Sequence, residues 1–127
     1  MIETSYAMLK RSALAFEEAD RQVRAELQKE GFGVLTEIDV AATLKKKINL
    51  DMPRYLILGA CAPQLAGQAL QQEPDVGLLL PCNVVVREDS EGVVVEALDP
   101  VRQLALSGNR ALEPLAGEAR ERLQRAL

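Results

Sequence analysis

The spacing of apolar residues along the chain predicts a mixture of helices and strands. One stripe recurs every three or four residues, which is the period of a helix face. Its members are Phe16, Ala19, Val23 and Leu27. Ser12 precedes the stripe as the predicted N-cap, and Gly31 follows it where a left-handed residue commonly ends a helix.

Five segments have the composition of strands. Ile2–Leu9 is apolar but alternates irregularly, whereas Phe32–Ile38 alternates regularly, which places Phe32, Val34, Thr36 and Ile38 on one predicted face. Tyr55–Cys61 is apolar on both faces, as expected of a central strand. Cys82–Glu88 and Val93–Ala97 are β-branched runs joined by a short polar loop with glycine, which predicts a hairpin.

The remaining segments predict further helices. Asp39 is the expected N-cap of a helix over Val40–Ile48, and proline begins another that extends to about Gln72. Asp99 precedes a short helix, and a final one is expected to begin between residues 109 and 114. This order favours an α+β fold in one domain, residues 1–127, with helices packed on one face of a mainly antiparallel sheet.

Composition narrows the classes of function. The formal net charge is −4 and aromatic residues make up 3% of the chain, so we expect no nucleic-acid partner. No apolar run approaches the ~18 residues of a membrane helix and the start has no signal-like pattern, so we expect a cytoplasmic protein without a membrane partner. Without histidine and with two cysteines, the sequence predicts no metal site, no cofactor and no histidine-dependent catalysis.

A series of short motifs resembles one family over nearly the whole chain. The motifs are the blocks Glu30–Val40, Thr43–Lys45, Leu58–Pro63, Glu73–Pro74, Gly77–Val86 and Asp99–Pro100. They resemble DUF302, a family of small bacterial and archaeal proteins of unknown function. The resemblance implies a fold like that of the TATA-binding protein and a homodimer, but no reaction. Ala62 departs from the pattern, because many members have asparagine directly after the first cysteine, which is Cys61 in this chain.

Two cysteines are the centre of the candidate site. Cys61 lies at a predicted strand end directly before a helix N-terminus, where free N–H groups favour a thiolate. Cys82 begins another strand beside Asn83, and the two thiols would meet if these strands are neighbours. Glu37 and Lys45 complete the candidate ligand-binding set, and Glu37 could form an acid–base pair with either Lys45 or Lys46.

Each of these residues also has a structural interpretation. Free cysteine is among the most buried residue types, so both thiols can simply fill the core. Lysines near the end of a helix complement its dipole without any further role.

Three functions compete on this evidence. The first is a homodimer that binds a small molecule or handles thiols at Cys61 and Cys82. The second is a non-catalytic interaction module with both cysteines buried. The third is an enzyme with a thiolate nucleophile, whose base would have to be a carboxylate or a lysine. The sequence leaves open whether there is any catalysis, and we expect Cys61 to be the more reactive thiol.

Overall fold

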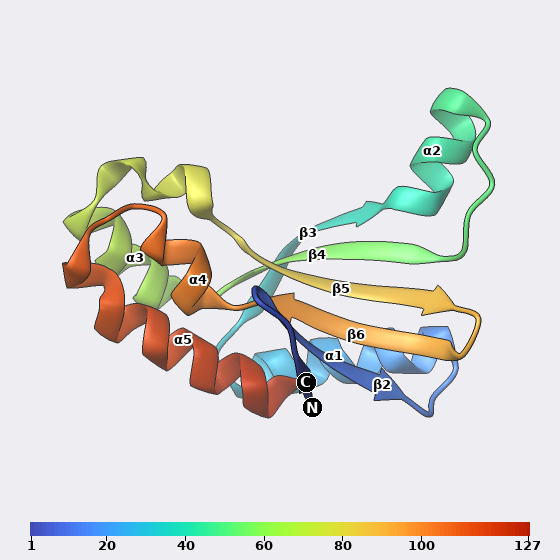
Figure 1. Cartoon of the computed structure of the whole chain (residues 1–127), viewed down its shortest axis with the longest axis horizontal. Coiled ribbons are helices and arrows are strands. Elements are labelled where there is room, and N and C mark those ends of the chain that lie inside the picture. Colours follow the sequence, from blue (N-terminus) through green and yellow to red (C-terminus); the bar gives the residue numbers. More distant parts are fainter.

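The protein is an antiparallel six-stranded sheet with helices on one side and at one end (Figure 1). The computed structural model describes all residues, 1–127. The strands are β1 (Ile2–Glu3), β2 (Ala7–Ser12), β3 (Gly33–Asp39), β4 (Tyr55–Cys61), β5 (Cys82–Asp89) and β6 (Gly92–Leu98). The helices are α1 (Phe16–Lys29), α2 (Val40–Ile48), α3 (Pro63–Gln72), α4 (Pro100–Ala105) and α5 (Glu113–Ala126), with the short 3₁₀ turns η1 (Pro74–Leu79) and η2 (Arg110–Leu112).

The sheet order is β1-β2-β6-β5-β4-β3, and every neighbouring pair is antiparallel. The α+β fold predicted from the sequence is therefore confirmed. Its likeness to the TATA-binding protein stays a prediction. None of the helices is long and apolar enough to cross a membrane.

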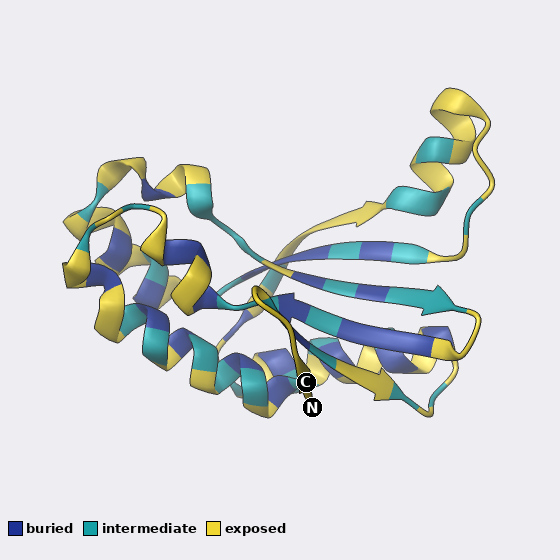
Figure 2. Cartoon of the chain, in the orientation of Figure 1, coloured by how far each residue is buried: buried dark blue, intermediate teal, exposed yellow.

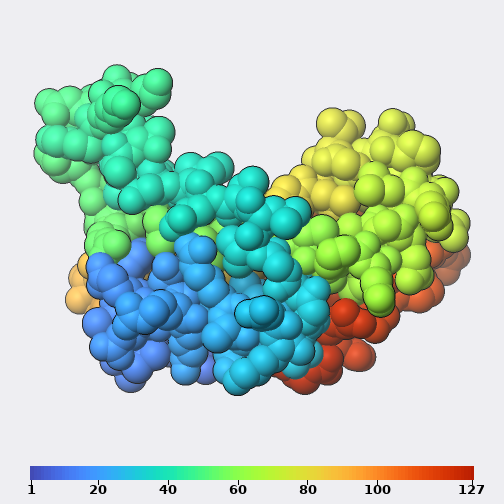
Figure 3. Space-filling view, turned by 180° about the vertical axis from the view of Figure 1, so that it is seen from behind, coloured from blue at the N-terminus to red at the C-terminus, as the bar shows by residue number.

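One face of the sheet is covered by α1 and α5. Alternate residues of the central strands form this face and are almost fully buried, among them Leu58, Val84 and Val86. They pack with the predicted stripe of α1, all four members of which are buried. Seen from behind, α1 lies across the covered face, while α2 projects away from the body and buries no residue (Figure 3).

Several helix ends follow the predicted chemistry. Gly31 has a φ of +83° directly after the C-cap of α1, a conformation that glycine adopts without steric cost. The Asp39 carboxylate accepts a 2.9 Å hydrogen bond from the N–H of Ala42 at the start of α2. Asp99 caps α4 in the same way, accepting from the N–H of Val101 at 2.9 Å.

The prediction of one first strand over Ile2–Leu9 is wrong. A turn separates β1 from β2, because the Thr4 hydroxyl accepts hydrogen bonds from the N–H groups of Tyr6 and Ala7. Strand β2 also continues beyond the predicted end to Ser12, since it pairs along β6. Lys10 and Arg11 lie in the part of β2 that extends beyond its pairing with β1, and both side chains are exposed to solvent.

The predicted N-cap role of Ser12 is also wrong. Helix α1 begins at Phe16 after Ala15, which has no side-chain cap. The Ser12 hydroxyl instead accepts a 3.1 Å hydrogen bond from the N–H of Leu14 in the connecting turn. A serine hydroxyl can bind the backbone of a local turn instead of capping a helix, and Ser12 does so here.

Strand β3 contains a bulge that the sequence pattern did not predict. Its register with β4 shifts between Val34, opposite Ala60, and Thr36, opposite Gly59. The extra residue turns Ile38 to the uncovered face, so the four residues predicted to share one face are divided. A Cβ at Gly59 would collide with the Thr36 hydroxyl and lie 3.0 Å from a ring carbon of Pro81, so glycine permits this close approach.

A second, smaller layer lies at one end of the sheet. Helices α3, α4 and α5 meet there around a cluster of five buried residues, Ala69, Val76, Leu104, Leu112 and Ala116. The helices that hold this cluster lie beyond the end of β4 and the start of β5, on the left of Figure 1. The space between the two packed layers holds the candidate site.

Candidate functional site

A cavity of about 250 Å³ lies between the sheet and the second layer. Seventeen residues line it and fourteen of them are hydrophobic, so its wall is almost entirely apolar. No charged side chain belongs to the wall. Two of its lining residues, Leu35 and Leu70, are exposed large apolar side chains, which places solvent access beside them. We call this space the cysteine cavity, because both cysteines line it.

The two thiols reach the cavity from neighbouring strands. Cys61 is the last residue of β4, and Cys82, the first residue of β5, lies opposite Ala60. Both are free and half-buried. Ala62, the N-cap of α3, provides no side-chain hydrogen bond to the helix, in keeping with the absence of a polar residue at this position.

Burial, and to a smaller extent the nearby Cys61 thiol, raises the pKa of the Cys82 thiol to about 11. Both causes disfavour the thiolate, because a buried anion loses hydration and a neighbouring thiolate repels it. Cys82 is therefore a neutral thiol at physiological pH. It contributes a weakly polar wall to the cavity instead of a nucleophile.

Gln103 is the one polar residue among the buried residues of the chain, and it lines the cysteine cavity. It lies on α4 and is only 6% exposed. Its Nε2 donates hydrogen bonds to the backbone oxygens of Leu79 and of Pro81, the latter at 3.2 Å. Its Oε1 is buried and has no hydrogen-bond partner.

Sequence reasoning missed Gln103, although a signal was present. Pro100, Gln103 and Leu104 follow the i, i+3, i+4 spacing of one helix face, and all three are buried. A glutamine on the inward face of a short helix indicates either a structural hydrogen bond or a polar group directed at a site.

The other three sequence candidates lie outside the cavity. Asn83 is exposed and belongs to the opposite, uncovered face of the sheet, because side chains alternate along β5. Glu37 accepts a 2.9 Å hydrogen bond from Arg24 of α1. Lys45 forms a 2.8 Å ion pair with Asp51. The structure thus brings Cys61 and Cys82 together, but not the anticipated acid and base.

No group of three or more cysteine, aspartate or glutamate side chains lies close enough to hold a metal ion. Many of the carboxylates form ion pairs with arginines.

The uncovered face of the sheet is a second surface of interest. Half-buried or exposed apolar residues lie along it, namely Leu9, Ile38, Tyr55, Ile57, Val85 and Leu98. We call this set the open face. In Figure 2 no helix lies in front of the strands that form the open face, whereas helix α1 lies behind them.

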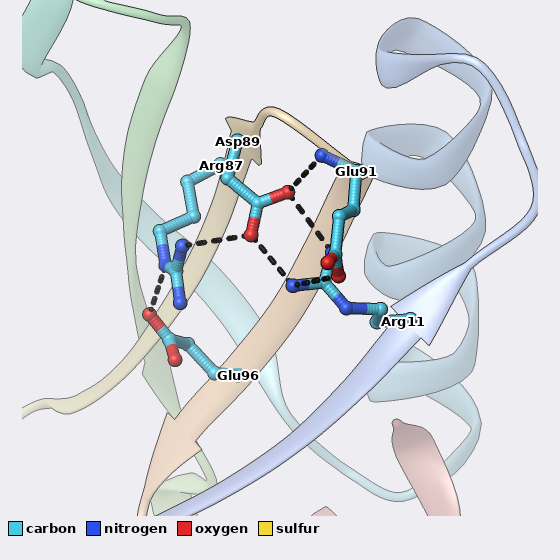
Figure 4. A network of polar contacts seen from close by, with 5 residues as sticks. All are labelled: Arg11, Arg87, Asp89, Glu91 and Glu96. Atoms are coloured by element: carbon cyan, nitrogen blue, oxygen red, sulfur yellow. Dashed lines mark hydrogen bonds and ion pairs between the residues drawn. The ribbon is translucent and has the colours of Figure 1, made fainter.

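An ion-pair network crosses one part of the open face (Figure 4). Arg11 of β2 binds Asp89 through two hydrogen bonds, at 3.0 and 2.6 Å, and Arg87 binds Glu96 at 2.8 Å. The Arg11 guanidinium holds the pKa of the Asp89 carboxyl well below its usual range. Val94 lies between the two arginines in the strand register and is fully buried. The network therefore covers apolar surface and is itself only partly exposed to solvent.

Comparison with known proteins places this chain in a family. The model of DUF302, a domain of unknown function, matches residues 8–127. The chain belongs to the DUF302 family. A solved structure, that of an uncharacterized conserved DUF302 protein from Bacillus stearothermophilus, is 27% identical, with a TM-score of 0.91 over 98% of this chain and 97% of that one. None of the curated proteins matches.

This family assignment confirms the resemblance predicted from the sequence motifs. The matched region includes both cysteines and Gln103, so the cysteine cavity lies within the DUF302 domain. The family name states no activity, and the function has to be argued from the site.

Proposed function

We propose that this DUF302 protein binds a small molecule in the cysteine cavity and acts as a homodimer. The observation that carries the binding proposal is the almost entirely apolar wall, in which the only non-cysteine polar side chain is Gln103. Pockets for small ligands are typically apolar, with a few placed polar groups that fix orientation. An apolar ligand would gain dispersion contacts with this wall.

Binding fits the site better than thiolate catalysis. A nucleophilic thiol needs a base within hydrogen-bond reach, but Glu37 and Lys45 are engaged elsewhere. The raised pKa of Cys82 also removes it as a thiolate near neutral pH. Cys61, at the N-terminus of α3, is the thiol that a reactive ligand would meet.

A volume change in the cavity tests the proposal. Ala66 is half-buried on α3 and lines the cavity, so Ala66→Leu should fill part of it. Toluene binding, measured by isothermal titration calorimetry, should weaken at least about 10-fold, the effect of roughly 1.4 kcal/mol. Gln68→Leu adds the same side chain on an exposed position of the same helix and should leave binding unchanged. Absence of toluene binding to the wild-type protein would contradict the proposal.

Dimerisation is supported by the open face. Apolar residues on the uncovered side of a sheet are unfavourable in water, and a second copy of the same chain presents an identical apolar surface. The Arg87–Glu96 pair lies in the same face, and two such pairs related by a twofold axis have complementary charges. Five strands about 4.8 Å apart and about 20 Å long give a projected area of about 480 Å² per protomer, or about 960 Å² in total, which is the size of a weak or transient interface.

Sedimentation equilibrium tests this surface. Val85 is central in the open face, and Val85→Asp should convert a dimer into a monomer because it buries an unpaired charge at the interface. Ala25→Asp places the same charge on the exposed side of α1 and should leave the dimer intact. A monomeric wild-type protein at micromolar concentration would contradict the dimer, and a dimer that survives Val85→Asp would exclude this face.

A further inference from the structure

The buried amide of Gln103 has a fixed orientation. Its Nε2 faces two backbone oxygens, those of Leu79 and Pro81. A flipped amide would put Oε1 against the same two carbonyls, where oxygen repels oxygen, so the hydrogen-bond network determines the assignment. The donor end of the side chain is therefore satisfied by the protein.

The acceptor end is not satisfied. Oε1 has no donor within hydrogen-bond distance, although the residue is nine-tenths or more buried. Buried polar atoms in folded proteins nearly always have a partner, and an exception needs an explanation. The protein around Gln103 supplies none, and the side chain belongs to the wall of the cysteine cavity. A molecule in the cavity is the remaining source of a donor.

The rest of the wall limits what that molecule can be. No charged residue lines the cavity, and an ion transferred into apolar surroundings without a partner is strongly disfavoured. The volume of about 250 Å³ exceeds the roughly 150 Å³ of an apolar cavity that accepts benzene. One aromatic ring with a small substituent, or an aliphatic chain of similar size, therefore fits.

We infer that the ligand is an uncharged, largely apolar molecule with one hydrogen-bond donor, of the class of alcohols and phenols, whose donor binds Gln103 Oε1. This inference rests on the proposed function, since it names the ligand class of the same cavity. In this view Gln103 selects ligands that carry a hydrogen-bond donor, and the apolar wall provides most of the affinity for the ligand.

Toluene and phenol separate the claim that the cavity binds apolar molecules from the claim that Gln103 selects a hydrogen-bond donor. The two compounds have nearly the same shape and differ in one hydroxyl group. The affinities of both are measured by calorimetry at pH 7, where phenol is neutral, for the wild-type protein and for Gln103→Met. The ratio of the toluene dissociation constant to the phenol dissociation constant should be about 10-fold higher in the wild-type protein, the effect of one hydrogen bond to a buried acceptor. The cost of dehydrating the hydroxyl cancels in this comparison of ratios.

The outcomes are distinguishable. If both compounds bind the two proteins with the same ratio, the role of Gln103 is wrong while the proposed site stands. If neither binds the wild-type protein, the proposed site itself is wrong. Should Gln103→Met fail to fold, a crystal structure of the wild-type protein with phenol decides. A hydroxyl oxygen within about 3.2 Å of Oε1 supports the inference, and one beyond hydrogen-bond distance overturns it.

Discussion

Cys82 should react with iodoacetamide much more slowly than Cys61 in the native protein. Only the thiolate is alkylated, and burial raises the pKa of Cys82 to about 11 from an ordinary value of 9.0. At pH 7.5 this lowers the thiolate fraction about 100-fold, from about 3% to about 0.03%. A thiolate of higher pKa is intrinsically more nucleophilic, which offsets about 10-fold of that loss. A rate at least about 10-fold below that of Cys61 remains, since Cys61 also lies at the N-terminus of α3.

Single-cysteine variants make the assay unambiguous, because trypsin leaves both thiols in one peptide, Tyr55–Arg87. Cys61→Ser and Cys82→Ser are each alkylated for timed intervals and followed by intact mass. The variant that retains Cys82 should label slowly, with a rate that still rises above pH 9. The two variants should be labelled at similar rates in denaturant, because unfolding exposes both thiols to water.

Equal native rates, or faster labelling of Cys82, would refute the reasoning about burial. Failure of Cys61 to label until the protein unfolds would show that the cysteine cavity does not admit a molecule of this size to that thiol. The folding of each variant is checked by circular dichroism, so that a labelled unfolded fraction is not mistaken for native reactivity.

Three further predictions concern stability and pH. Leu123 is fully buried on α5, so Leu123→Ala should lower the free energy of unfolding by about 2–5 kcal/mol in urea titrations, while exposed Leu106→Ala should change it by less than about 0.5 kcal/mol. Gly59→Ala should cost about 1–3 kcal/mol because the new methyl group meets the Thr36 hydroxyl, and adding Thr36→Ala should restore part of the loss. Because the pKa of the Asp89 carboxyl is lowered in the folded state, its ionisation stabilises the protein above the unfolded pKa of about 4. Thermal melts should therefore show Asp89→Asn to be less stable than wild type at pH 7, with a difference that shrinks as the pH falls below 4.

Much of the fold follows from local sequence patterns. The β-branched runs around Gly92 form the predicted hairpin, and β4 has the bounds that its continuous apolar run indicated. Aspartates at helix starts act as N-caps because their carboxylates bind free N–H groups. Each of these signals depends on residues that are close in sequence.

The errors arise where a tertiary contact decides the structure. Ser12 had the chemistry of an N-cap, but pairing of β2 with β6 keeps it in the sheet. The bulge in β3 depends on the contact between Thr36 and Gly59, which lie on different strands. Neither contact has a signal in the local hydrophobic pattern.

The candidate site was predictable only in part. The proximity of Cys61 and Cys82 followed from the hypothesis that their strands are neighbours, which the pairing of β4 with β5 supports. Asn83 could not share that site, since the residue after Cys82 faces the other side of a strand. Glu37 and Lys45 were paired by charge alone, and each has a nearer partner of opposite charge.

Chemical-shift mapping of toluene on the ¹⁵N-labelled wild-type protein tests the central claim, that the cysteine cavity is a binding site for a small uncharged molecule. The account predicts saturable shifts at amides of α3, α4 and the adjoining ends of β4 and β5, which surround the cavity. Shifts that do not saturate, or that are confined to the open face, would contradict it.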